Sequence, residues 1–413
     1  MSELPIPELR PGPPWVMEEM VAAEPDLARA LPELRRASRG IAAAIRRTMD
    51  GSGRVSVVGC GTSEHAAMGV AALLDEAVVV AGGRPGSVVA RQAFEAALEP
   101  WPDGLLVGIS HEAETRATIA ALDAARRLAS ATALITANPG GPAAASADHV
   151  LATSLLDRSW CHTVGYVSPL VAGAAIAAEL ATLPLDVSAP DASAPAASGD
   201  ASAPDAVSRD AAPDAAASRD AAALEAHLRS GLGLAAPANV VARELWGVDR
   251  FVICGSGIDA IGARELALKI EEGVRLPAVA RDLETELHGH LVSADERCGL
   301  IVLVTDPLRA GPRAARAYQL LLAGRRLGMR TAGILAAGAF DAWDPDATSA
   351  GRIRVDIGVG VPPRLAALTG AAIALQLLTI GLVHLSGNNP DRIRREDPDH
   401  HASADIVGAS FPL

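Results

Sequence analysis

The stretch VSVVGCGTSEHAA, from Val55 to Ala67, decides the fold of the first half of the chain. Its β-branched run predicts a short buried strand, its glycines predict a tight turn, and the residues after the turn predict a helix. Residues 250–270, RFVICGSGIDAIGARELALKI, repeat this order. The sequence therefore predicts two units built on the same plan.

Further short apolar runs follow in both halves, and they read LLVGIS (105–110), TALITA (132–137) and GLIVLVTD (299–306). Alanine-rich helical stretches lie between them. Continuous apolar strands that alternate with helices are typical of a mostly parallel sheet covered on both faces. The predicted fold class is α/β.

The composition excludes several classes of protein. Among the 413 residues, Lys and Arg number 36 against 49 Asp and Glu, so the chain is acidic and a poor general binder of nucleic acid or an anionic membrane. The four cysteines are scattered and form no CxxC pair, which argues against a disulfide framework or a zinc site. No apolar signal segment is visible between Met1 and Pro14. We expect a cytoplasmic protein without a bound metal.

Residues 186–222 are rich in Ala, Ser, Pro and Asp and hold almost nothing large to bury, which predicts a disordered linker. This linker gives the expected organisation, which consists of an N-terminal helical lead-in (1–40), a first domain (41–185), the linker (186–222), a second domain (223–386) and a C-terminal tail (387–413).

Each half closes with a long apolar helix, expected at about residues 169–185 and 365–385. The second could pass for a membrane span by its length. Its richness in Ala and Gly, its counterpart in the first half, and the interruptions at Gln376 and His384 favour a buried helix. We expect such helices to pack between the halves and between subunits.

The glycine turn at residues 59–63 resembles a cradle for a small anion. Backbone N–H groups at a helix N-terminus, with the hydroxyls of Thr62 and Ser63 and the close approach that Gly61 allows, suit a phosphate. A simple tight turn explains the same residues equally well. His65, just beyond the turn, is expected either to line the pocket or to pack or be solvated.

Three segments together resemble the sugar isomerase (SIS) domain family, and they read GCGTSEHAA (59–67), ISHEAETRATIAALDAAR (109–126) and CHTVGYVSPL (161–170). The tandem plan resembles the isomerase half of glucosamine-6-phosphate synthase and related amino-sugar-phosphate deaminases and ketose isomerases. The resemblance implies two flavodoxin-like, doubly wound SIS domains in tandem, a homodimer, a phosphosugar substrate and no cofactor.

The resemblance also assigns a catalytic set in the segment RELALKIEEG and the loop after it. Glu265, Lys269 and Glu272 stand at i, i+4 and i+7 and share one helical face. A solvated stripe of salt bridges is the plain alternative. However, Lys269 is the only lysine of the chain, and arginine cannot replace an amine where a proton must leave. Chance survival of one lysine under a codon bias toward arginine explains the same count equally well.

The expected chemistry is the movement of a carbonyl between C1 and C2 of a sugar. A carboxylate lifted toward neutrality by partial burial can act as the base, and Glu272 matches the family's base. His288 of the LHGH segment matches the histidine that opens the ring, and in related dimers it comes from the other subunit. Lys269 would stabilise the enolate-like oxygen or handle a proton at C2, and Glu265 would hold Lys269 in place.

Several residues depart from the family's pattern. The usual SxSGET loop reads Ser-His-Glu-Ala-Glu-Thr from Ser110 to Thr115, so that Glu112 replaces a hydroxyl and is repulsive to a dianion unless it is turned away or paired. The expected substrate-binding residues are Gly61, Thr62, Ser63, Ser110, Thr115 and Thr163. His290 replaces the proline of HGP, and the C-terminal active-site lysine is absent. The tail arginines, Arg392, Arg394 and Arg395, are expected to form a surface cluster or to contact an anion.

Only about forty residues precede the first unit, so we expect no glutaminase domain and either free ammonia or no nitrogen chemistry. The sequence thus predicts a phosphosugar isomerase or deaminase that acts on an amino-sugar or ketose phosphate. The alternative is a non-catalytic sugar-phosphate sensor, although no helix-turn-helix or basic arm accompanies the two units.

Overall fold

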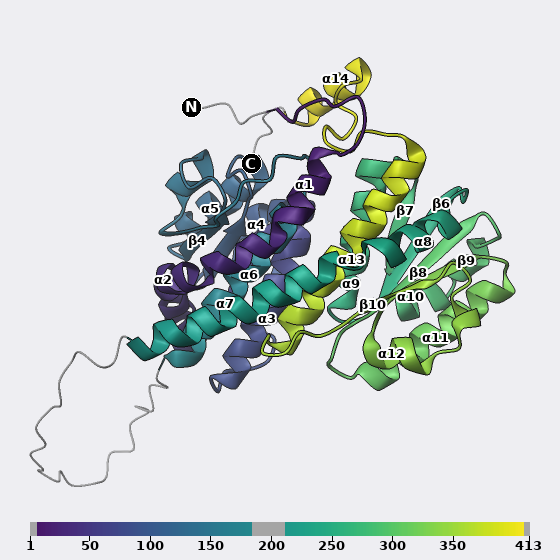
Figure 1. The fold of residues 1–413 in the computed structure, drawn as a ribbon. Helices are drawn as coiled ribbons and strands as arrows, with labels where there is room; N and C mark the ends of the chain where they lie inside the picture. The colour runs from purple at the N-terminus through teal and green to yellow at the C-terminus, as the bar shows by residue number, and fades with distance from the viewer. Residues whose placement is uncertain (1–5, 184–210, 409–413) are drawn as a thin grey trace, which may run out of the picture.

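The computed structural model of the protein describes residues 6–183 and 211–408 and contains two five-stranded sheets (Figure 1). The first sheet has the order β2-β1-β3-β4-β5, and the second has the order β7-β6-β8-β9-β10. All of their strand pairs are parallel. The strands are β1 (Val55–Gly59), β2 (Val88–Gln92), β3 (Leu105–Ile109), β4 (Ala131–Thr136), β5 (His149–Ala152), β6 (Arg250–Gly255), β7 (Ala278–Asp282), β8 (Cys298–Val304), β9 (Arg330–Ala336) and β10 (Arg352–Val355).

Both sheets therefore share the strand order of a flavodoxin-like doubly wound fold, which confirms the predicted tandem of α/β units. The central strands β3 and β8 are buried along their whole length, as their continuous apolar sequences predict.

Helices cover both faces of each sheet. The first sheet lies between a layer of α2 (Leu31–Asp50), α3 (Thr62–Val80) and α6 (Val164–Thr182) and a layer of α4 (Ala93–Leu98) and α5 (Arg116–Arg127). The second lies between α8 (Ala235–Leu245), α9 (Asp259–Lys269) and α13 (Pro363–Ser386) and a layer of α10 (Leu283–Leu287), α11 (Ala310–Arg326) and α12 (Ala337–Ala342). The remaining elements are α1 (Val16–Ala23), η1 (Glu24–Ala30), η2 (Pro142–Ser146), α7 (Ala211–Leu232), η4 (Ile270–Val274), η5 (His290–Ser293), η6 (Pro345–Ala347) and α14 (Pro398–Val407).

The two long apolar helices meet where the units join, and α13 packs against α6 (Figure 1). By length and composition either helix could cross a membrane, but 72% of the most apolar window of α6 and 100% of that of α13 are buried. They therefore serve as core helices, in keeping with the buried helices that the sequence predicts. Helix α6 begins at Val164, earlier than expected, because Pro169 is tolerated within the helix.

The predicted disordered linker, 186–222, is wrong at its end, because α7 begins at Ala211. Alanine has the highest helix propensity, and this alanine-rich segment carries enough apolar side chains to dock: Ala217, Ala221, Leu224 and Leu228 are buried. Helix α7 packs against η1, α2 and α13 and so clamps the N-terminal lead-in to both units. The rest of the predicted linker, up to residue 210, lies outside the described residues.

The backbone turns that follow β1 and β6, the first strands of the two units, have the same tight geometry. A Cβ atom on Gly59 would lie 2.3 Å from the carbonyl oxygen of Ser63, and one on Gly255 would lie 2.3 Å from the carbonyl oxygen of Asp259. Any side chain at these two positions would collide with the first turn of the following helix. Glycine is therefore required at the end of β1 and of β6 for the backbone to turn this tightly.

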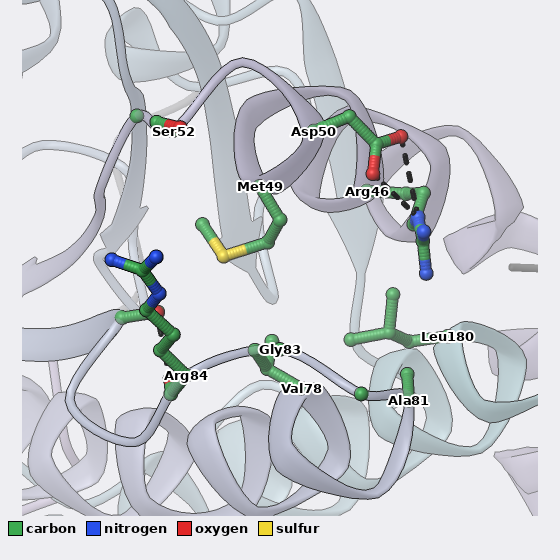
Figure 2. A pocket seen from close by; sticks show the side chains of 12 residues that line it. Arg46, Met49, Asp50, Ser52, Val78, Ala81, Gly83, Arg84 and Leu180 are labelled. Atoms are coloured by element: carbon green, nitrogen blue, oxygen red, sulfur yellow. Dashed lines mark hydrogen bonds and ion pairs between the residues drawn. The ribbon is translucent and has the colours of Figure 1, made fainter. Parts of the chain in front are cut away.

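A pocket of about 330 Å³ opens between the ends of α2 and α3 (Figure 2). It is lined by Met49, Val78 and Leu180 together with the ion-paired Arg46 and Asp50. The pocket adjoins Gly53, which precedes β1, so it lies at the amino end of the strand. Ligands of doubly wound folds bind at the carboxyl ends of the strands. This pocket lies at the opposite end of the strands and therefore does not suit the predicted chemistry.

The lead-in buries a carboxyl group. Glu24 in η1 is fully buried, and its carboxyl group meets the side chain of Gln376 in α13, which favours the charged form. Burial, with a smaller contribution from the charge of Asp157, raises the pKa of Glu24 well above its ordinary value of 4.5. The group is therefore held in its neutral form by the fold.

We expect Glu24→Gln to remove a pH dependence of stability. The folded protein retains the Glu24 proton at pH values where the unfolded chain has lost it, so stability falls as pH rises from about 4.5 toward the raised pKa. The slope from one such group reaches about 1.4 kcal/mol per pH unit. Urea unfolding of both proteins across this range should show that the difference between them grows with pH. Glu33→Gln on the exposed face of α2 is the control, and a parallel pair of curves for wild type and Glu24→Gln would contradict the prediction.

Candidate functional site

The first part of the candidate site lies at the carboxyl ends of β1 and β3, where the strand order reverses. Gly61 has a φ of 56°, and Thr62 and Ser63 begin α3 immediately after it. Ser110 follows β3 and is fully buried, and its hydroxyl group donates a hydrogen bond to Thr115 Oγ1 at 3.2 Å. Because β1 and β3 are neighbours, the structure brings the glycine turn and the 110–115 loop to the switch point that binds ligands in such folds.

The second part lies at the end of α9, where the helix continues as the π-helical turn η4. Lys269 Nζ lies 2.5 Å from Glu272 Oε2 and 3.5 Å from Glu265 Oε1. The side chains of Lys269 and Glu265 are 0% and 1% exposed, whereas that of Glu272 is 19% exposed. The alternative of a solvated surface stripe is thus excluded, and a π-turn of this kind is frequent at functional sites.

The buried ammonium is held in its charged form. Burial alone would lower the pKa of Lys269, but the carboxylates of Glu272 and Glu265 raise that pKa above its ordinary value. Burial would likewise raise the pKa of Glu265, yet Lys269 and a hydrogen bond from His65 lower it. A fixed ammonium beside a partly exposed carboxylate suits the stabilisation of negative charge on a reacting oxygen more than the donation of a proton.

Glu265 connects the two units. Its Oε1 accepts a hydrogen bond from Thr62 Oγ1 at 3.3 Å, and its Oε2 lies 2.6 Å from His65 Nδ1. Both partners belong to the first turns of α3 in the other unit. Thr62 is therefore engaged by a carboxylate, and the glycine turn is more than a tight connection because it fixes the orientation of the buried pair.

The loop before α6 adds a second buried carboxylate. Asp157 accepts hydrogen bonds from the backbone N–H groups of Ser159, Thr163 and Gly165 at 3.1, 2.6 and 3.1 Å. Burial opposes its ionisation, but contact with His162 and the charges of the nearby histidines lower the pKa of Asp157 to about 2. Asp157 thus holds the start of α6, and it places Thr163, whose buried hydroxyl has no hydrogen-bond partner among the described residues.

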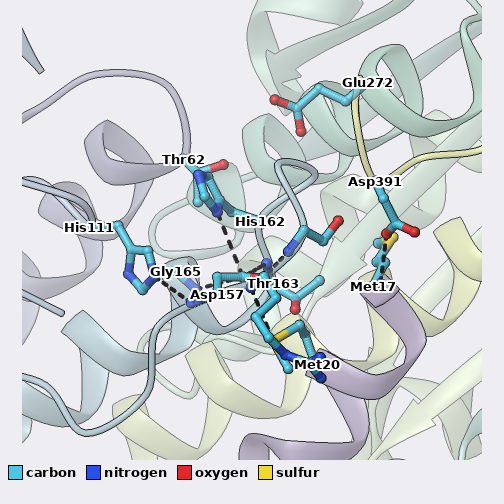
Figure 3. A network of polar contacts seen from close by, with 12 residues as sticks. Met17, Met20, Thr62, His111, Asp157, His162, Thr163, Gly165, Glu272 and Asp391 are labelled. Carbon is cyan, nitrogen blue, oxygen red and sulfur yellow. Dashed lines mark hydrogen bonds and ion pairs between the residues drawn. The ribbon is translucent and has the colours of Figure 1, made fainter. Parts of the chain in front are cut away.

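Two histidines, His111 and His162, lie close to Asp157 (Figure 3). His111 Nε2 accepts a hydrogen bond from the Asp157 N–H at 2.7 Å, and burial together with the charge of His162 lowers the pKa of His111 to about 4. His162 Nδ1 lies 3.7 Å from Asp157 Oδ2, and although burial works in the opposite direction, Asp157 raises the pKa of His162. The two ring centroids lie 5.4 Å apart, and the opposite directions of the two pKa shifts make His162 the easier of the two to protonate.

The predicted ring-opening histidine lies elsewhere in the chain. The side chain of His288 is 72% exposed, and its Nδ1 lies 2.8 Å from the carbonyl oxygen and 3.2 Å from the carboxylate of Glu284. Within the described residues its polar contacts are with Glu284 alone. The structure brings Glu265, Lys269 and Glu272 together, but it does not bring His288 to them within one chain.

The C-terminal tail reaches the rim of the site. The Asp391 carboxylate accepts hydrogen bonds from the N–H groups of Val16 and Met17 at 2.9 and 2.8 Å, which fastens the tail to the start of α1. A pocket of about 490 Å³ then lies between Glu272 and the tail residue Arg394. The guanidinium of Arg395 stacks on the ring of Trp160 at 4.8 Å. Arg394 and Arg395 are exposed and border the site, whereas Arg392 is partly buried and donates a hydrogen bond to the Pro7 carbonyl oxygen at 2.8 Å.

The sequence analysis left the role of His65 open, and it did not assign His111, Asp157 and His162 to the site. Three of them stand in the segments that carry the family resemblance, and Asp157 precedes the last of these segments. Their contacts join residues that lie up to 200 positions apart, which no local spacing reveals.

Comparison with known proteins bears on the family and the fold of the chain. The family model described as the SIS domain matches residues 49–178. No curated protein matches the sequence.

Solved structures resemble the chain over nearly its whole length. The C-terminal domain of glucosamine-fructose-6-phosphate aminotransferase from Francisella tularensis has a TM-score of 0.73 and 17% identity, covering 93% of this chain and 100% of that one. Tagatose-6-phosphate ketose/aldose isomerase from Escherichia coli has a TM-score of 0.64 and 19% identity, with coverages of 91% and 95%. Glucosamine-6-phosphate deaminase from Thermotoga maritima has a TM-score of 0.56 and 14% identity, with coverages of 91% and 97%.

At these identities the structures establish the fold, and the family match identifies the first unit. The second unit repeats the strand order of the first, and the similar structures span both. The chain therefore contains an SIS domain at residues 49–178, followed by a second unit with the same doubly wound fold.

Proposed function

We propose that this protein is a sugar isomerase or deaminase that transfers a proton between C1 and C2 of an amino sugar or ketose derivative. The observation that carries the proposal is the fully buried Lys269, which lies between Glu265 and Glu272 and is tied through Glu265 to the glycine turn of the first unit. The names of the similar structures, which include a phosphosugar isomerase and an amino-sugar-phosphate deaminase, support the same reaction class.

Each residue of the site has a role in this reaction. Glu272 removes the proton from C2 or C1 and returns it to the neighbouring carbon, since its carboxylate is partly exposed beside the pocket. The Lys269 ammonium stabilises the enediolate oxygen that forms, and Glu265 positions Lys269. Gly61, Ser63, Ser110, Thr115 and Thr163 supply the surface that holds the sugar. His288 of a second copy in a homodimer opens the ring, and the reaction takes place in the cytosol.

The buried charges favour an enzyme over a sugar-phosphate sensor. Burying an ammonium with two carboxylates costs several kcal/mol of desolvation per ion, and such an arrangement adds little to stability compared with apolar packing. A module that only binds sugar needs hydrogen-bond partners and gains nothing from an ammonium fixed beside a carboxylate. Groups perturbed in this way, at the mouth of a pocket, are typical of catalytic sites.

Proton NMR in deuterated water tests the proposal. The full chain is incubated with hexose 6-phosphates, glucosamine 6-phosphate and their unphosphorylated counterparts, with and without ammonium. We expect deuterium to appear at C1 or C2 of one substrate, with loss of the exchange in Glu272→Gln. Thermal stabilisation by a sugar without exchange in any of them would instead identify a sensor and overturn the enzymatic function.

A further inference from the structure

The loop that follows β3 carries an unpaired acid. The side chain of Glu112 is partly buried, and burial raises its pKa. Within residues 6–183 and 211–408, its carboxylate has no hydrogen-bond or ion-pair partner, although its backbone carbonyl accepts a hydrogen bond from Asn138 at 3.1 Å. The backbone is therefore fixed while the carboxylate remains available to a ligand.

The charges around Glu112 do not suit a dianion. Its electrostatic neighbours are the acids Glu114 and Asp157 and the bases His162 and Arg395. With Glu112 itself, three carboxylates stand against two cations even when His162 is protonated. Of those cations, Arg395 rests on the Trp160 ring. A phosphate dianion in this loop would meet net negative charge, and the repulsion would weaken its binding.

Two of the hydroxyl donors near the loop are already engaged, those of Ser110 and Thr62. Ser110 donates to Thr115 at 3.2 Å, and Thr62 donates to Glu265 at 3.3 Å. An ionised carboxylate accepts hydrogen bonds and donates none. The group that complements Glu112 must therefore bring its own donors, as the hydroxyl groups of a sugar do and a phosphate dianion does not.

We propose that the loop from Ser110 to Thr115 holds the hydroxyl-bearing end of an unphosphorylated sugar, and that Glu112 is the residue that selects it over the corresponding sugar phosphate. This inference rests on the proposed function and names its substrate class. Glu112 accepts hydrogen bonds from the terminal hydroxyls, while Glu272 and Lys269 act at C1 and C2. Glu112 is thus a specificity residue and takes no part in proton transfer.

Paired substrates test this assignment. We measure kcat/KM for fructose, glucosamine and their 6-phosphates with wild type, Glu112→Gln and Glu112→Ser. Wild type should prefer the free sugar by about tenfold or more, and both variants should lower that preference by about tenfold or more, mainly through a lower KM for the phosphate. Glu95→Gln removes the same charge from an exposed position on α4, outside the loop, and it should change the ratio by less than about threefold.

The possible outcomes separate this inference from the proposed function. A wild-type preference for the 6-phosphate, or a preference for the free sugar that Glu112→Gln leaves unchanged, would overturn the specificity assignment and leave the isomerase intact. An absence of turnover with every sugar would refute the proposed reaction. In that case, calorimetric titration of the same sugar pairs still decides the inference, because tighter binding of the phosphate by wild type would contradict it.

Discussion

The variant Glu272→Gln should lower kcat by roughly 10²–10⁴-fold, the usual contribution of a positioned general base. Glutamine keeps the size of the side chain and can still accept a hydrogen bond from Lys269, which lies 2.5 Å away in the wild type. It cannot take up a proton from carbon. Because Glu265 remains beside Lys269, the buried ammonium keeps one counter-charge and the fold should persist.

The neighbouring acid provides a matched control. Glu271 precedes Glu272 in the same π-turn but is exposed, and it accepts a hydrogen bond from the Ala278 N–H at 3.3 Å. Glu271→Gln removes an equal charge one residue away along the chain and should keep kcat within about threefold. Deuterium exchange at C1 or C2 would be followed by NMR for both variants. A wild-type rate in Glu272→Gln would show that another group is the base.

The sequence predicts the fold well because the decisive signals are local. Each unit begins with an apolar strand and a glycine that lies close to the first turn of the next helix. Few structures other than a strand, a tight turn and a helix are compatible with this sequence pattern. The error at the end of the linker has a physical cause as well. The composition of an alanine-rich segment without large side chains predicts disorder, whereas the helix propensity of alanine predicts a helix. Here the packing of α7 against the rest of the protein decides in favour of the helix.

The candidate site is predicted only where its residues lie on one helix. The spacing of Glu265, Lys269 and Glu272 places them on a common face, and the uniqueness of the lysine draws attention to it. The contact of His65 with Glu265 is invisible in the sequence, since it depends on how the two units pack. The same holds for His162, whose pKa is raised by Asp157 through the folding of the loop before α6.

These contacts explain why the two units occur as a pair. The ammonium and its carboxylates come from the second unit, whereas the glycine turn and the 110–115 loop come from the first. Glu265 is the residue that binds them together, because it is an acceptor for Thr62 and His65 and a counter-charge for Lys269. Neither unit alone contains the complete arrangement.

The variant Lys269→Met is expected to lower the free energy of unfolding by about 3–5 kcal/mol, because removing one partner of a buried pair leaves an uncompensated buried charge. Lys269 has no exposed surface, and the carboxylate of Glu265 is equally inaccessible. Methionine fills most of the volume of the lysine stem, so the loss reflects charge more than a cavity. Urea unfolding followed by circular dichroism would measure it.

The double variant Lys269→Met/Glu265→Gln separates stability from catalysis. Neutralising Glu265 removes the stranded charge and should recover part of the lost stability, whereas turnover should remain absent because no ammonium stabilises the enediolate. Lys269→Arg keeps the positive charge, but its larger planar guanidinium cannot occupy the position 2.5 Å from Glu272 that the ammonium takes, so it should also lose activity. If the double variant is no more stable than Lys269→Met, the penalty arises from packing and not from the buried carboxylate. Wild-type turnover in Lys269→Arg would refute the role of the amine, since only the compact ammonium fits between the two acids.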